Sequence, residues 1–193
     1  RPLERGLKTW VDWGQYDEYE RFSFVADTDR KAALKSLRVL LPEYKKCARI
    51  VGLSGLGKTR LAFEVFRDIE VHDDLSNRVV YADASAIPSI LGLVTDWVQC
   101  GQEGIVVIDN CDVSLHEKLR REIQRTNSKL SLLTLDFNPE SAGPTHIIQL
   151  KQLSDEHIKQ MLEPVYGKQI SDLDRIVAFA QGFPQMAVLL ADA

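Results

Sequence analysis

The feature that most constrains this chain is the segment 52–59, GLSGLGKT, which fits the pattern GxxxxGK[ST] at every fixed position. A short apolar run, 48–51, ends just before it, and an amphipathic stretch begins near Lys58. A strand, a glycine-rich loop and a helix in this order form the context in which the pattern binds phosphate. The alternative is a glycine-rich turn beside an ordinary helix, and we reject it because pattern and context agree.

The chemistry of a phosphate site explains these residue types. Glycines let successive backbone N–H groups turn toward one phosphate, and the positive end of the following helix dipole points at it. Lys58 is expected to reach the β- and γ-phosphates, and the Thr59 hydroxyl is expected to bind Mg²⁺. The residues expected to bind the phosphates are Gly52, Ser54, Gly55, Leu56, Gly57, Lys58, Thr59 and Arg60.

A second segment, 104–109, supplies the carboxylate that such a site needs. An apolar strand there would deliver Asp109 to the carboxyl edge of a sheet, where the ligands of open α/β sheets bind. Thr59 and Asp109 are therefore the expected metal residues. The alternative is an acid in an ordinary strand-end turn. The phosphate-binding pattern at 52–59 in the same chain favours the metal role over this alternative.

The residue after Asp109 bears on hydrolysis. Many hydrolysing P-loop ATPases carry a second acid there to orient water, whereas this chain has Asn110, which can hydrogen-bond water but cannot accept its proton. Asp112 has two alternative roles, as a substitute acid or as the cap of the following helix. The candidate catalytic residues are Lys58, Asp109 and Asn110, and the missing second acid makes the sequence favour nucleotide binding over hydrolysis. Because no NKxD motif occurs, adenine is the expected base.

Apolar runs and amphipathic stretches alternate along the chain. The runs predict strands covered on both faces of a parallel sheet, and the stretches predict helices packed on that sheet, so the predicted fold is α/β. After residue 150 the helical pattern continues alone, which predicts the start of a small all-α subdomain. The predicted strands are 48–51, 79–82, 105–108 and 130–135, with 147–150 as a fifth candidate. The predicted parts are a linker or lead-in at 1–28, a P-loop nucleotide-binding domain at 29–150 and a helical subdomain at 151–193.

Composition narrows the partners and the compartment. The chain has 24 Lys and Arg against 28 Asp and Glu, a net charge of −4, so we expect no direct nucleic-acid binding. No apolar run approaches the roughly 20 residues of a membrane-spanning helix, so we expect no membrane partner and a cytoplasmic location. The three cysteines form no CxxC pair and are expected to be reduced. The chain lacks an initial Met and ends in an apolar stretch, so we expect it to be part of a longer protein.

Together the motifs resemble the STAND class of P-loop ATPases, the NB-ARC-like and NACHT-like switch domains. The similar segments are 24–26 at the adenine side, 52–59 as Walker A, 105–109 as Walker B, 130–134 as the sensor strand and 182–184 as the GxP motif. The resemblance implies an ASCE-type sheet with the sensor strand between the Walker A and Walker B strands. It implies that Phe24, Val25 and Pro184 lie near the adenine and that Thr134 senses the γ-phosphate.

Two departures from the family pattern bear on turnover. Leu135 and the residues after it follow Thr134, where many members carry a phosphate-sensing arginine, and Asn110 replaces the second acid. Both differences imply slow turnover.

The leading hypothesis is an ATP/ADP-binding switch ATPase domain with Mg²⁺ as its metal. The resemblance implies effector and sensor domains outside this segment and homo-oligomers on activation, as in immune receptors, transcriptional regulators and bacterial antiphage proteins. One alternative is a small-molecule kinase whose lid carries Arg120, Arg121 and Arg125. The other is a non-catalytic module that binds nucleotide structurally.

Overall fold

The computed structural model describes residues 6–15, 17–67, 75–138, 140, 143–167 and 172–193. Its strands are β1 Leu7–Thr9, β2 Cys47–Val51, β3 Val79–Asp83, β4 Glu103–Asp109, β5 Lys129–Asp136 and β6 His146–Gln149. They form one sheet in the order β1-β3-β4-β5-β2-β6, parallel throughout except for β1, which runs antiparallel to β3. Every predicted strand is present, and β5 lies between β2 and β4 as the family resemblance implies.

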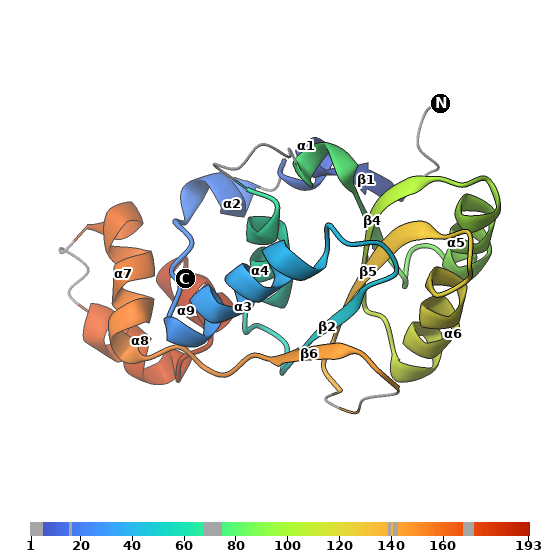
Figure 1. Cartoon of the computed structure of the whole chain (residues 1–193). Helices are drawn as coiled ribbons and strands as arrows, with labels where there is room; N and C mark the ends of the chain where they lie inside the picture. Colours follow the sequence, from blue (N-terminus) through green and yellow to red (C-terminus); the bar gives the residue numbers. More distant parts are fainter. Residues whose placement is uncertain (1–5, 16, 68–74, 139, 141–142, 168–171) are drawn as a thin grey trace.

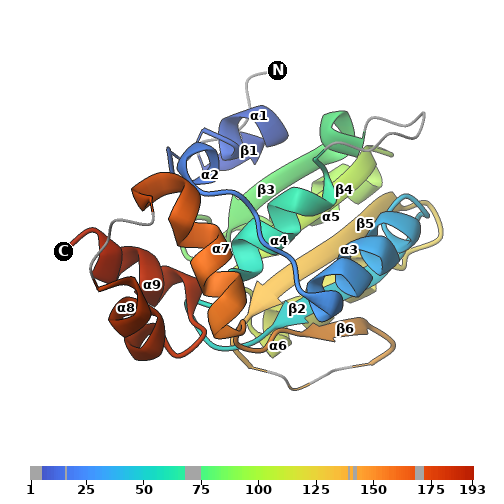
Figure 2. The same ribbon diagram turned by 90° about the vertical axis from the view of Figure 1, so that its left-hand side faces the viewer.

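Helices cover both faces of this sheet. On one face lie α1 Trp10–Trp13, α3 Thr28–Leu40 and α4 Lys58–Val65, and on the other lie α5 Ile90–Gln99 and α6 Val113–Ile123. The short helix α2 Asp17–Arg21 follows α1, and the 3-10 helix η1 Leu75–Arg78 precedes β3. Figure 1 shows α5 and α6 to the right of the sheet and α3 and α4 to its left. Figure 2, turned by 90°, shows α3 and α4 in front of the sheet.

Burial explains the composition of the central strands. Every residue of β2 is buried, and β5 exposes only its first residue, because helices cover both faces. Arg49 is the one charged residue of β2, and its side chain is only 1% exposed. A buried guanidinium requires partners that balance its charge, and those partners belong to the site described below.

Each face of the sheet has an apolar core, and a third core lies in the helices after the sheet. It joins α7 Asp155–Tyr166, α8 Leu173–Ala180 and α9 Pro184–Ala191, which lie at the far left of Figure 1. The turn between α8 and α9 depends on Gly182, whose φ is +77°. A Cβ there would lie 2.3 Å from the Leu153 carbonyl oxygen, and the Gly182 carbonyl accepts a hydrogen bond from the Leu153 amide. Only glycine fits this approach, so the turn is fixed against the segment that leads into α7.

The N-terminal segment has more structure than the sequence pattern predicts. It adds β1 to the edge of the sheet, where Leu7–Thr9 pair with the residues of β3. Trp13 is fully buried in the core beside α4, and Phe22 is buried in the core of α7–α9. Leu7 belongs to the core on the α5 and α6 face, so the described part of 6–28 contributes to all three cores. The division of the chain at residues 28 and 150 stays a prediction.

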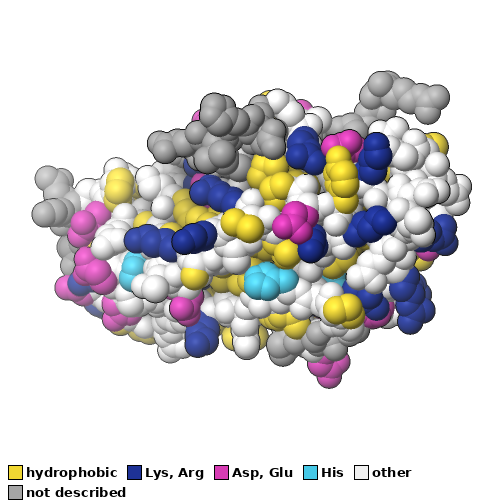
Figure 3. All heavy atoms as spheres, in the orientation of Figure 1, with side chains coloured by type: hydrophobic (Ala, Val, Ile, Leu, Met, Phe, Trp, Pro, Cys, Tyr) yellow, Lys and Arg dark blue, Asp and Glu magenta, His cyan; other side chains and the backbone are white. Residues whose placement is uncertain are grey.

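The surface carries both signs of charge. On the face shown in Figure 3, Lys and Arg side chains lie interspersed with Asp, Glu and neutral side chains. No helix in the described part of the chain has the length and apolar character needed to cross a membrane.

Candidate nucleotide-binding site

A cavity of about 510 Å³ lies at the carboxyl edge of the sheet, within the size range of ligand pockets. The loop before α4 forms one wall, the ends of β4 and β5 form another, and the first turns of α9 close the third. Its lining includes Ser54, Gly55, Gly57, Lys58, Thr59, Arg60, Asp109, Asn110 and Pro184, all of them predicted site residues. The structure therefore brings most of the predicted site together.

The phosphate-loop geometry rests on glycine conformations. Gly55 and Gly57 have φ of +82° and +84°, a region that favours glycine. Gly57 caps α4 without any side-chain hydrogen bond, which leaves the first amides of the helix to a ligand. Lys58 Nζ donates to the carbonyl oxygens of Gly52 at 2.8 Å and Leu53 at 3.0 Å. Burial lowers the pKa of Lys58, although the nearby Asp109 and Asp136 act in the opposite direction.

The predicted metal residues are in direct contact. The Thr59 hydroxyl donates to Asp109 Oδ2 at 2.7 Å, and the Tyr81 hydroxyl lies 3.2 Å from the same oxygen. A hydroxyl and one carboxylate fit Mg²⁺, which usually keeps several waters and takes its remaining ligands from phosphates. The sequence did not indicate Tyr81, because a tyrosine inside an apolar strand gives no sign of where its hydroxyl points.

Asn110 lines the cavity but is tied to a neighbouring strand. Its φ is +53°, and its Nδ2 donates to Asp83 Oδ1 at 3.0 Å. Burial alone would raise the pKa of Asp83, but hydrogen bonds from Asn110 and Ser85 outweigh it and lower that pKa. Asp112 takes the second of its two predicted roles, since its Oδ1 accepts from the Leu115 amide at 2.7 Å and caps α6.

A smaller hollow of about 70 Å³ contains the residues predicted to lie near the adenine. Phe24, Val25 and Pro184 all line it, together with Leu56 of the phosphate loop. Phe22, Gly57, Arg60 and Pro184 line both this hollow and the main cavity. The lining is mostly apolar, with Ser23, Arg30 and Arg60 as its polar residues, and it adjoins the phosphate loop.

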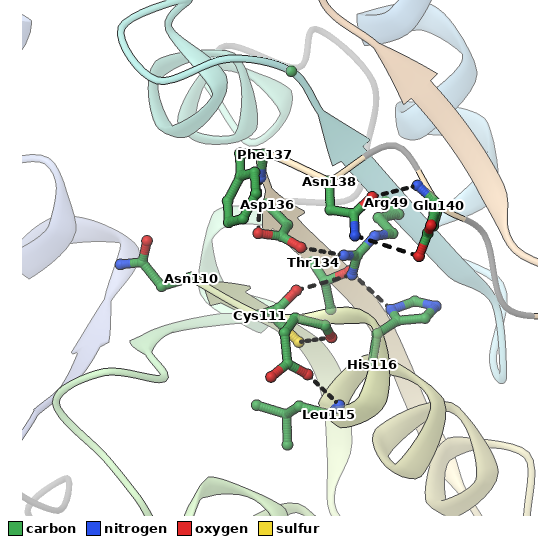
Figure 4. A network of polar contacts seen from close by, with 12 residues as sticks. Arg49, Asn110, Cys111, Leu115, His116, Thr134, Asp136, Phe137, Asn138 and Glu140 are labelled. Atoms are coloured by element: carbon green, nitrogen blue, oxygen red, sulfur yellow. Dashed lines mark hydrogen bonds and ion pairs between the residues drawn. The ribbon is translucent and has the colours of Figure 1, made fainter.

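Thr134, the predicted γ-phosphate sensor, does not line the cavity. It is fully buried, and its hydroxyl lies 2.8 Å from His116 Nδ1 and 3.3 Å from the Arg49 guanidinium (Figure 4). Thr134 and Asp136 lie two residues apart and therefore share one face of β5, but only Asp136, the last residue of the strand, reaches the cavity at the sheet edge. No motif in the sequence indicated Asp136 or its partner Arg49.

The buried network behind the cavity holds a neutral histidine. His116 is 1% exposed, and its other ring nitrogen lies 2.9 Å from the Thr145 hydroxyl. Burial, and after it the nearby Arg49 charge, lowers the pKa of His116 to about 4. The histidine is therefore uncharged at neutral pH, and Arg49 is the cation of this network.

The low pKa of His116 predicts a pH dependence of stability. The unfolded chain binds a proton near pH 6.5 and the folded chain only near pH 4, so the contribution of His116 to stability is complete above about 6.5 and is lost as pH falls toward 4. The asparagine in His116→Asn takes up no proton. We therefore expect the Tm of His116→Asn to fall less than the Tm of the wild type when the pH is lowered from about 7.5 to about 4.5. Thermal unfolding at both pH values measures this, with His146→Asn at an exposed position as control. Equal losses in wild type and His116→Asn would contradict it.

The sequence matches no protein-family model and no curated protein, but solved structures share its fold. ORC1 of Aeropyrum pernix in complex with DNA has a TM-score of 0.62 at 16% identity, covering 98% of this chain and 64% of that one. DnaA bound to AMPPCP and single-stranded DNA has a TM-score of 0.58 at 14% identity, covering 87% and 62%. A STAND protein with a tetratricopeptide repeat sensor from Pyrococcus horikoshii has a TM-score of 0.56 at 17% identity, covering 88% and 30%.

The fold is that of a P-loop ATPase. The STAND resemblance is confirmed at the level of fold, because a STAND protein is among the similar structures. The chain spans only 30% to 64% of the length of these three proteins.

The comparisons correct one expectation. A net charge of −4 led to the prediction of no nucleic-acid binding, yet two of the similar structures are of DNA-bound proteins. Net charge over one domain does not exclude nucleic acid, because contacts depend on where the charges lie and on the rest of the protein.

Proposed function

We propose that this chain is an ATP- and ADP-binding switch domain of the STAND type, acting within a longer protein with effector and sensor domains. The observation that carries the proposal is the position of the cavity between the phosphate loop and α9. A nucleotide there would contact both the α/β core and the helical group. Differential contacts of this kind are what allow a ligand to favour one arrangement of two bodies over another.

In this proposal, different residues contact the phosphates, the adenine and the Mg²⁺ ion. The amides of 52–59 and the Lys58 ammonium would bind the phosphates, and Phe24, Val25 and Pro184 would contact the adenine. Thr59 and Asp109 would hold Mg²⁺, which supplies charge neutralisation at the β- and γ-phosphates. Release of the helical group when ATP replaces ADP, followed by assembly of several copies, completes the proposed switch.

Pro184 is the sharpest test of this coupling. It begins α9 and lines both the main cavity and the smaller hollow. We expect Pro184→Ala in the longer protein to release ADP about 5- to 30-fold faster, because a contact between base and helical group is worth about 1–2 kcal/mol. Stopped-flow release of a fluorescent ADP measures the rate. Pro164→Ala, a proline inside α7, is the matched control, and an unchanged ADP release rate in Pro184→Ala would remove this coupling role.

The kinase alternative is weaker because its expected lid residues, Arg120, Arg121 and Arg125, do not line the cavity. Arg120 bonds Glu117 and Gln124, and Arg125 pairs with Glu122, all within α6 and the turn after it. Transfer of phosphate to a small metabolite in preference to water would favour the kinase.

The non-catalytic alternative is tested by ATP turnover. Equal rates of ATP turnover in wild type and Lys58→Ala would show that the site binds nucleotide without hydrolysing it.

A further inference from the structure

The segment 19–25, which we call the strap, connects the α/β core with the helical group and forms part of the cavity wall. Tyr19 and Phe22 line the main cavity, and Phe22 and Phe24 line the smaller hollow. On the side of the core, the Tyr19 ring lies 4.8 Å from the Phe63 ring of α4 between centroids. On the other side, Phe22 is 5% exposed within the core of α7–α9. Figure 1 shows α2, where the strap begins, between α1 and α7.

Arg21 ties the strap to the helical group. Its guanidinium binds both carboxylate oxygens of Asp192, with Nη1 at 3.1 Å from Oδ2 and Nη2 at 2.6 Å from Oδ1. Nη2 also donates to the Tyr166 hydroxyl at 2.8 Å, and that hydroxyl donates to Asp192 Oδ1. The guanidinium carbon lies 5.2 Å from the centre of the Tyr166 ring. These three residues, from α2, α7 and the end of α9, form one closed set of contacts, which we call the latch.

The latch supplies a cation at the end of α9. Asp192 is the C-cap residue of this helix, and a carboxylate at the negative end of a helix dipole is unfavourable by itself. The hydrogen bonds of Arg21, and after them that of Tyr166, lower the pKa of Asp192. Arg21 and Asp192 are therefore both charged at neutral pH. The acid at this helix end is stabilised by its partner in the strap.

The helix α9 connects the latch to the phosphate loop. In its first turn, the Gln185 amide donates to the Gly55 carbonyl oxygen at 3.3 Å. In its middle, Val188 and Leu189 line the main cavity, and Asp192 caps its end. The helix has only eight residues, so it moves as one piece. A movement of α9 away from the phosphate loop must therefore either break the latch or pull the strap away from the core.

The strap is held more firmly on the side of the core. The Arg60 guanidinium of α4 lies 4.7 Å from the centre of the Tyr19 ring, and the preceding segment packs Trp10 and the fully buried Trp13 against the core. Pulling the strap from the core would expose these aromatic rings, whereas opening at the latch exposes Phe22 alone. The two charged side chains of the latch are 43% and 40% exposed, and exposed ion pairs are easily broken. The latch is therefore the end that opens.

We propose that the strap closes the nucleotide cavity and that the latch of Arg21, Tyr166 and Asp192 controls nucleotide exchange. This inference rests on the proposed nucleotide-binding function. In the closed state, the strap and α9 form one wall around the nucleotide. When the latch opens, the strap stays on the core while α9 moves away with the helical group, and the nucleotide can leave.

The first test measures ADP release in variants of the latch. Arg21→Gln and Asp192→Asn each remove one charge of the pair. We expect each variant to release a fluorescent ADP about 3- to 10-fold faster than the wild type in stopped flow, the size expected for one exposed ion pair with a cation–π contact. The double variant should release ADP no faster than the single variants, because both break the same contact. Arg175→Gln, which breaks an exposed ion pair with Asp172 inside the helical group, is the matched control. Its release rate is expected to equal that of the wild type.

Exchange of the two charges provides a second test. Arg21→Glu places two acids side by side and is expected to release ADP faster than Arg21→Gln. Adding Asp192→Arg to Arg21→Glu restores an ion pair and puts a cation at the end of α9, where the helix dipole favours it. We expect this double variant to release ADP at a rate close to that of the wild type.

Hydrogen exchange gives a readout that does not depend on nucleotide. Arg21 lies outside α9, so its replacement leaves the sequence of that helix unchanged. In the nucleotide-free protein, we expect the amides of α9 to exchange about 3- to 10-fold faster in Arg21→Gln than in the wild type, because local opening of the helical group becomes easier. The amides of β4 should exchange at the wild-type rate.

Three outcomes would overturn the proposal. They are unchanged ADP release in both Arg21→Gln and Asp192→Asn, an equal acceleration in Arg175→Gln, and a charge-exchanged double variant that releases ADP as fast as Arg21→Glu. A folded wild type that binds no ADP would instead overturn the proposed function. Hydrogen exchange of α9 would then still decide whether the latch holds the helical group, so the two failures are distinguishable.

Discussion

Replacement of Trp13 by alanine is expected to lower the free energy of unfolding by about 3–5 kcal/mol, as for other buried tryptophans. Trp13 is fully buried and stacks on Tyr81 at a centroid distance of 4.4 Å. It also meets the edge of the Phe63 ring at 5.4 Å and contacts Phe66. Alanine would leave a cavity among these rings, and the strand that carries Tyr81 also carries the contact to Asp109.

Denaturant unfolding measures the effect of Trp13→Ala, and Trp10→Ala provides the comparison. Trp10 stacks on Phe63 at 4.9 Å but is only partly buried, so its loss should be smaller. Equal stability of wild type and Trp13→Ala would mean that the N-terminal segment does not belong to the folded core.

Replacement of Lys58 by alanine is expected to raise the Kd for ATP by about 30-fold or more. A charge-assisted contact to a desolvated phosphate is worth about 2 kcal/mol at the least when one partner is removed. Lys58 lies over the phosphate loop, with Asp109 and Asp136 close enough to affect its pKa. The change should leave the fold intact, because alanine suits the first turn of α4.

Fluorescence titration with a labelled ATP measures the effect of Lys58→Ala. Lys31→Ala, on the exposed side of α3, is the control for loss of a positive charge. Equal ATP affinity in Lys58→Ala and Lys31→Ala would show that the loop does not bind phosphate in the predicted way.

The parts of the fold that the sequence predicts are those with a local pattern. Parallel strands buried on both faces appear as apolar runs, and the phosphate loop has a fixed spacing of glycines before Lys58. β1 has only three residues, too few for a period, and its pairing with β3 depends on tertiary packing. The aromatic residues of the N-terminal segment likewise show no period.

The missed residues are those that depend on register. The family resemblance implied Thr134 as the residue at the γ-phosphate, but pairing of β5 with β2 puts Asp136 opposite Val51 at the cavity. One signal was present in the sequence, since Arg49 interrupts an apolar strand. A charge inside a doubly covered strand requires an opposite charge nearby, and this requirement pointed to an acid at the same edge of the sheet.

Calorimetric titration of the folded wild-type chain with ADP and with ATP in the presence of Mg²⁺ tests nucleotide binding most directly. We expect saturable binding at one site per chain, with ATP binding weakened when Mg²⁺ is removed by a chelator. A protein that is folded by circular dichroism but releases no heat with either nucleotide, and does not bind labelled ATP, would contradict it.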